Sequence, residues 1–166
     1  MSMRCSNCGE RAKIVTGNYL FKESGLDWVT LVGIKMVKCP HCGNQDPIIS
    51  RPNDLMRVVA RAIIHKPYRL TGKEVRFLRK HLGMTAEKFS HLLDVDKTTV
   101  SKWENDDDKV GAQSDRLIRL LSTILDPNLR TEQQKAVELL PRIKGVVRHP
   151  CINVNTQKMR YEYAVA

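Results

Sequence analysis

The sequence lacks the segments that mark membrane-inserted or exported proteins. No run of about 18 apolar residues occurs in the 166 residues, and no basic stretch followed by an apolar one stands at the N-terminus. A cysteine pair starting at Cys5 stands there instead. We therefore expect a protein with no membrane partner that works in the reducing cytoplasm.

Signatures of common enzyme classes are also missing. The sequence contains no His-Glu-X-X-His motif, no Gly-rich phosphate loop and no serine or cysteine nucleophile in a recognisable setting. We therefore expect that the protein is not an enzyme, with a zinc-dependent enzyme as a minor alternative.

Aromatic and acidic residues are scarce. Aromatic residues make up 5% of the chain, which disfavours an RNA-binding ribbon because single strands are usually bound by stacking on aromatic side chains. The chain has 28 Lys and Arg against 18 Asp and Glu, a formal charge of +10. This excess favours a polyanionic partner through long-range attraction and counterion release, and nucleic acid is the obvious candidate.

Cysteine is infrequent, but four of the five cysteines form two Cys-X-X-Cys pairs, each followed by glycine: Cys5, Cys8, Cys39 and Cys42. Two chelating pairs of thiolates complete the tetrahedral sphere of Zn²⁺ and leave no position for water or substrate. We predict one structural Zn²⁺ per chain at these ligands. Disulfides are the alternative, which the missing export signal disfavours. Cys151 is predicted to be a small buried or incidental thiol rather than a fifth ligand.

Alternating apolar residues between the two pairs predict β structure. Residues 28–32 and 34–38 are each expected to form a short strand, with Gly17, Gly25 and Gly33 at turns or bulges. The prediction for residues 1–50 is a small zinc-ribbon-like β domain.

Helical periodicity begins after Pro52. Residues 51–68 are predicted to form a linking helix with one apolar face, made of Leu55, Val58, Val59, Ala62 and Ile63. A second helix should start at Thr71, whose hydroxyl forms a capping box with Glu74. It opens a helical domain predicted at residues 69–128.

Two short helices joined by a tight turn are predicted next. The first runs from Thr85 to Leu92 with Phe89 and Leu92 inward, and Asp96 caps the second, which continues to about Glu104. In the second helix, Val100 and Trp103 should face the core. Four polar residues share the outward face and are the predicted contacts to double-stranded DNA: Lys97, Thr98, Ser101 and Lys102.

Residues 84–105 resemble the phage-repressor and Cro-like (XRE) helix-turn-helix family, and the added cysteine pairs make the chain similar to zinc-finger antitoxins of the MqsA or YgiT type. The resemblance covers roughly residues 5–125. It implies that the four paired cysteines bind zinc, that Thr98 and Lys102 read bases, and that the zinc domain binds a toxin. Asp94 stands where a glycine is common in the turn, so it is expected in a left-handed conformation.

Positive charge concentrates before the predicted reading helix. Residues 51–82 carry nine basic and two acidic residues, whereas residues 83–125 carry six and eight. The nine basic side chains are candidates for phosphate contacts, or simply a solvated surface. The acidic run at 106–108 is predicted to be a solvated loop pointing away from DNA.

The remaining residues are predicted to complete the core and to support a dimer. One helix is marked by apolar residues that should face the core: Leu117, Leu120, Leu121, Ile124 and Leu125. Residues 129–166 should hold another helix, starting near Thr131 with a capping box at Gln134, and a possible β-hairpin within 152–165. The hairpin is expected either to pack on the core or to pair with another chain.

These observations predict an α+β protein in which a small zinc-ribbon-like β domain precedes an all-α Cro-like helix-turn-helix domain. The leading hypothesis is a homodimeric, sequence-specific transcriptional regulator, an autorepressing antitoxin whose zinc domain binds a small toxin. The alternative is a stand-alone XRE-type regulator with a structural zinc domain and no toxin partner.

Overall fold

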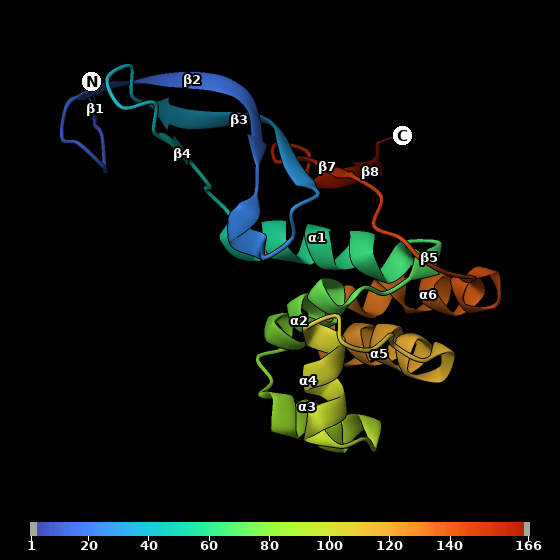
Figure 1. The fold of residues 1–166 in the computed structure, drawn as a ribbon. Coiled ribbons are helices and arrows are strands. Elements are labelled where there is room, and N and C mark those ends of the chain that lie inside the picture. The colour runs from blue at the N-terminus through green and yellow to red at the C-terminus, as the bar shows by residue number, and fades with distance from the viewer. Residues whose placement is uncertain (1–2, 165–166) are drawn as a thin grey trace.

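A computed structural model describes residues 3–164 and confirms the α+β fold (Figure 1). The strands are β1 (Met3–Arg4), β2 (Arg11–Leu20), β3 (Val29–Lys38), β4 (Gln45–Pro47), β5 (Tyr68–Arg69), β6 (Lys144–Val147), β7 (Ile152–Asn155) and β8 (Arg160–Tyr163). The helices are α1 (Pro52–His65), α2 (Gly72–His81), α3 (Ala86–Leu93), α4 (Lys97–Glu104), α5 (Ala112–Leu125) and α6 (Gln133–Leu139), with 3-10 turns at Lys22–Ser24, Pro127–Glu132 and Leu140–Arg142.

Strand β3 is the centre of the main sheet. The two short strands predicted around Gly33 are wrong, because the chain runs through this residue as one strand. Gly33 has φ +65°, and its N–H donates to the Asn18 side chain at 3.3 Å. The register with β2 shifts at this point, so Gly33 forms the predicted bulge rather than a break.

The C-terminal hairpin belongs to the same sheet. β7 pairs with β3 in parallel, with Val29 opposite Ile152, and β8 continues the sheet on the far side of β7. The described part of the hairpin therefore joins the N-terminal sheet of its own chain. Val165, which the sequence placed in this hairpin, lies outside the described residues.

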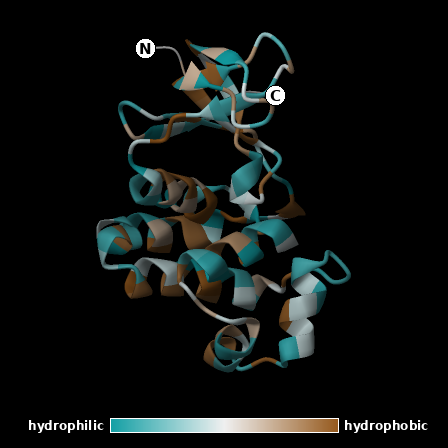
Figure 2. Cartoon of the chain, turned by 90° about the vertical axis from the view of Figure 1, so that its left-hand side faces the viewer, coloured by the Kyte–Doolittle hydropathy of each residue, from teal (hydrophilic) through white to brown (hydrophobic). Residues whose placement is uncertain are grey.

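Helix α1 lies between the sheet and the other helices and packs against both. Its buried residues are Leu55, Val58, Val59, Ala60, Ala62, Ile63 and Ile64. They contact α2, α6, β7 and β8, so one continuous core joins the sheet to the helices. Figure 2 shows hydrophilic and hydrophobic colours alternating along the helices, as expected for helices with one buried face.

The predicted core face of α5 is wrong for three of its five residues, whereas Leu120 and Leu121 are partly buried. Leu117, Ile124 and Leu125 are 39%, 44% and 41% exposed, whereas Asp115 and Arg119 are buried. Arg119 binds Asp115 at 2.8 Å and donates to the carbonyl oxygens of three residues from the last turn of α1 to β5, namely Ile64, Lys66 and Tyr68. These carbonyls need donors inside the protein, and that requirement turns the polar face of α5 inward.

Two smaller predictions also fail. Leu92 is 38% exposed, and its neighbour Leu93 fills the core instead. The predicted capping box at Gln134 does not form, because the chain enters α6 from a 3-10 turn and Gln134 donates to Glu138 at 3.0 Å. Within residues 3–164, no helix combines the length and the apolar character that a membrane span requires.

Candidate metal centre and nucleic-acid interface

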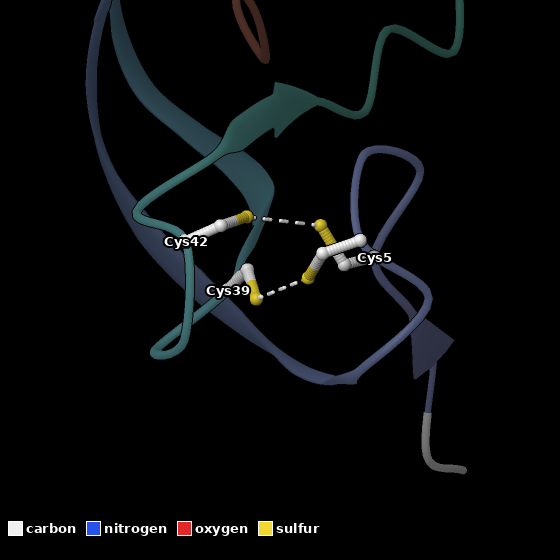
Figure 3. Close-up of side chains that lie close together, drawn as sticks. Cys5, Cys39 and Cys42 are labelled. Carbon is white, nitrogen blue, oxygen red and sulfur yellow. Dashed lines mark hydrogen bonds between the residues drawn. The ribbon is translucent and has the colours of Figure 1, made fainter.

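The four predicted zinc ligands come together at the open end of the β2–β3 hairpin, just before β2 begins and just after β3 ends. Their sulfur atoms all lie within 4.8 Å of one another, with Cys5 and Cys42 3.5 Å apart and Cys8 and Cys39 3.6 Å apart. Figure 3 shows the Cys5 and Cys42 side chains pointing toward one another beside Cys39. Cys151 lies exposed and outside this cluster.

The two cysteine loops have the same backbone geometry. In each loop the first cysteine donates its N–H to the residue five positions on, at 2.8 Å for Cys5 and 2.9 Å for Cys39. The glycine four positions on donates back to it, and Gly9 and Gly43 have φ +75° and +76°. Two such turns converge on one point, which is the arrangement of a pair of zinc knuckles.

The donor set fits Zn²⁺. A tetrahedral ion with sulfur at about 2.3 Å places its ligand sulfurs about 3.8 Å apart, close to the spacing found here. The Asn7 N–H donates to the Cys5 sulfur at 3.4 Å, and such bonds stabilise thiolate charge. These four cysteines could bind a metal ion such as zinc, and a ligand set of four thiolates favours a structural role.

The thiols of this cluster are also electronically distinct. The Asn44 N–H is the largest contribution that lowers the pKa of Cys42, to about 6. The Glu10 N–H opposes a rise at Cys8, but desolvation and bonds to the other sulfurs raise the pKa of Cys8 to about 12. The Asn44 N–H thus favours the thiolate of Cys42, the form in which cysteine binds a metal, whereas the neighbouring sulfurs oppose ionisation of Cys8.

Helices α3 and α4 form the predicted pair. The Thr85 hydroxyl caps α3 by accepting from the Lys88 N–H at 3.2 Å, and Asp94 adopts the left-handed conformation with φ +53°. Asp96 is the N-cap residue of α4, but its side chain makes no capping hydrogen bond. The helix boundaries therefore agree with the sequence, although the capping contact at Asp96 does not.

Helix α4 separates its buried and exposed residues as expected. Val100 and Trp103 are buried, at 0% and 4% exposure. The four residues predicted to contact DNA are all exposed on this one helix: Lys97, Thr98, Ser101 and Lys102. Figure 1 shows α3 and α4 at the end of the molecule opposite the β1–β2 end of the sheet, so their outer surface is open.

Ion pairs join α4 to α2, and the sequence did not predict them. Glu104 accepts from Arg79 at 2.6 and 2.9 Å and from Arg76 at 3.2 Å, and Arg76 also donates to Asn105 at 2.9 Å. Burial alone would raise the pKa of Glu104, but the two guanidinium groups outweigh it and lower the pKa. The orientation of α4 therefore depends on a charged pair.

The backbone at the start of α2 lies close against the end of α4. A Cβ atom added to Gly72 would stand 1.8 Å from the Trp103 carbonyl oxygen, so only glycine fits. The Gly72 N–H donates to the Asp106 carboxylate at 3.1 Å. Asp106 belongs to the acidic run predicted to point away, and this contact gives it a structural role in capping α2.

Most basic residues of the 51–82 segment have partners within the chain. Lys66 is fully buried and binds Glu74 and the Arg148 carbonyl, so it is not available to phosphate. Ion pairs also engage Arg51, Arg57, Arg61, Lys73, Arg76 and Arg79. Lys80 is exposed and makes no ion pair with any residue that the structure describes. The prediction of phosphate contacts is therefore wrong for Lys66.

Residues 75–124 match a known family described as helix-turn-helix, of the XRE type. The match runs from α2 to α5 and includes the whole α3–α4 pair. No curated protein matches the chain. The chain therefore contains an XRE-type helix-turn-helix domain, the DNA-binding unit of regulators, together with a four-cysteine cluster in its N-terminal region.

Proposed function

We propose that this protein is a sequence-specific transcriptional regulator that reads double-stranded DNA with the outer face of α4. The observation that carries the proposal is the match to the helix-turn-helix family. The second helix of the matched motif is α4, and only polar residues face outward at its start. In this motif the N-terminal residues of the second helix contact base edges in the major groove.

The exposed residues of α4 have suitable chemistry for this role. Lys97 and Lys102 can donate to guanine O6 and N7, and Thr98 and Ser101 can bond to either bases or phosphates. The Arg79–Glu104 pair supports the proposal by holding the helix in a defined orientation. Exposed Lys80 is a further candidate phosphate contact.

The regulator acts as a homodimer in this proposal. Leu117, Ile124 and Leu125 on α5, with Val137 on α6 at 46% exposure, give the helical region an apolar surface that a second copy would cover. A two-fold dimer would place two copies of α4 about 34 Å apart, one turn of DNA.

The zinc domain is proposed to bind a small toxin, which would make the protein an antitoxin that represses its own operon. The four-cysteine cluster combined with the helix-turn-helix domain supports this assignment, because zinc-finger antitoxins combine the same two parts. Bound to the cluster, Zn²⁺ would serve to fold this end of the sheet.

A second candidate is a stand-alone regulator without a toxin. The parallel pairing of β7 with β3 favours it, because the sheet is built into the core of the molecule and already has a structural role.

DNA reading is tested with two variants and a matched control. Lys102→Ala and Thr98→Ala should each weaken binding to the DNA upstream of the chain's own gene by about 1–3 kcal/mol and relax base preference. Lys158→Ala, at the exposed turn of the β7–β8 hairpin, should leave affinity unchanged. Fluorescence anisotropy at fixed salt measures all three, and unchanged affinity in both test variants would reject α4 as the reading helix.

The toxin is tested by native mass spectrometry of the protein isolated from its own cells. A dimer carrying one zinc per chain and a small second protein supports the antitoxin. The same dimer alone supports the stand-alone regulator.

A further inference from the structure

Strand β2 has a long edge that no described residue pairs with. β3 pairs with one side of β2 from Lys13 to Leu20, and β1 reaches the other side only at Arg11 and Ala12. Figure 1 shows β2 along the outer border of the sheet. Every second residue from 13 to 20 therefore directs its backbone N–H and C=O away from the sheet.

Most side chains of β2 give this edge little protection. Residues 14, 16, 18 and 20 are all exposed and share one face. Two of them are large and apolar, with Ile14 53% and Leu20 41% exposed. Sheet edges are usually shielded by short length, charged side chains or bulges. Lys13 is the one charged residue of 13–20, and the extra residue of the nearby bulge is Gly33 on β3, so β2 itself stays regular.

The edge of β8 at the other side of the sheet is different. β8 has four residues, and the Tyr163 hydroxyl donates to the Ala62 carbonyl of α1 at 2.6 Å. The Tyr161 hydroxyl bonds to His65 of the same helix at 2.9 Å. β8 is short and tied to the core, so the β2 edge is the better docking site.

Charge indicates what the β2 edge binds. β2 and β3 carry four basic residues and no acidic residue: Arg11, Lys13, Lys35 and Lys38. Lys13 is directly opposite Lys38, and Lys35 is opposite Thr16. An acidic strand would be attracted to these positive charges. A second copy of the chain would instead bring another strongly basic hairpin against them and be repelled.

We propose that residues 13–20 of β2 dock an acidic β-strand of a partner protein, which extends the sheet by main-chain hydrogen bonds. The partner's carboxylates would face Lys13 and Lys35, and its apolar residues would cover Ile14 and Leu20. This inference rests on the toxin-binding part of the proposed function, because it names the surface of the zinc domain that the toxin would occupy.

The test uses the small toxin that the proposed function requires, sought as a product of the same operon, mixed with the full chain. Hydrogen exchange of the wild-type complex should show slowed exchange at alternate amides of residues 13–20, because the added strand occupies their outward bonds. Calorimetry should show affinity at least tenfold lower for the Lys13→Glu/Lys35→Glu double variant and for Ile14→Lys. Val146→Lys is the matched control, since Val146 is a β-branched strand residue 54% exposed on β6.

The outcomes separate this inference from the proposed function. If the toxin binds tightly, but the β2 variants do not weaken binding and the amides of residues 13–20 are not protected, docking at the β2 edge is overturned while toxin binding stays intact. No binding of the wild-type chain would reject the toxin and the edge together. Protection of residues 13–20 that rises with the concentration of the chain alone would identify a second copy as the occupant and overturn the acidic partner. Zinc content and circular dichroism of each variant confirm that it is folded.

Discussion

Gly72→Ala should loosen α4 from α2 while leaving every predicted DNA contact chemically intact. The new Cβ would stand 1.8 Å from the Trp103 carbonyl oxygen and 2.7 Å from the Asp106 carboxylate. A carbon and a carbonyl oxygen normally approach to about 3.3 Å, so the two helices must separate by roughly 1.5 Å. The obstacle is backbone, and a side-chain rotation cannot relieve it.

The expected cost follows from two contributions. Overpacking at a rigid contact costs about 1–3 kcal/mol, and weakening the Asp106 cap of α2 adds about 1 kcal/mol. A loss of about 2–4 kcal/mol lowers the melting temperature of a chain this size by about 5–15 °C. Operator affinity should fall as well, since α4 moves relative to the rest of the domain.

The matched control is Gly111→Ala. Gly111 is the N-cap of α5, and a Cβ there meets no atom within 4 Å. Urea unfolding of the two variants gives the comparison, with anisotropy for DNA binding. A Gly72→Ala stability within about 0.5 kcal/mol of Gly111→Ala would refute the close approach of α2 and α4.

Three further perturbations test other parts of the structure. Cys42→Ser should release bound zinc and unfold the β2–β3 end, which metal analysis and circular dichroism measure; full retention of metal would reject the four-sulfur site. Because its arginine partners lower the pKa of Glu104, that ion pair should stabilise the fold above about pH 4.5 and lose its effect as the pH falls through the lowered pKa, so acid unfolding of Glu104→Gln should be less steep. If the stability of Glu104→Gln falls with decreasing pH as steeply as that of the wild type, the ion pair makes no such contribution. Arg119→Met leaves the buried Asp115 carboxylate with the Leu70 N–H but without its charged partner, and should cost about 3–5 kcal/mol in urea. A cost below about 1 kcal/mol would contradict the burial of this pair.

Local sequence signals predicted the helices and the cysteine cluster well. The capping box at Thr71 and Glu74 is present, and the left-handed residue at Asp94 ends α3 where the sequence placed the turn. These features depend on interactions over three to five residues, which a sequence displays directly. The spacing of the cysteine pairs similarly predicted that four sulfurs would meet.

Long-range requirements were not predictable in the same way. The leucines of α5 suggested a buried stripe, but carbonyl oxygens at the end of α1 and just after it need the Arg119 guanidinium. No spacing rule connects residues about 50 positions apart. The contact at Gly72 likewise depends on Trp103 from another helix. The DNA contacts, the dimer and the toxin remain predictions.

The parallel pairing of β3 with β7 also affects the order in which this protein is made. Val29 leaves the ribosome long before Ile152, and at 5–20 residues per second the delay is about 6–25 s. During that interval residues 29–32 of β3 lack their β7 partner, while β4 and both cysteine pairs are already synthesised. Early metal capture would hold the hairpin in register until the last strands arrive, so scarcity of zinc during translation should reduce the yield of folded protein more than its removal afterwards.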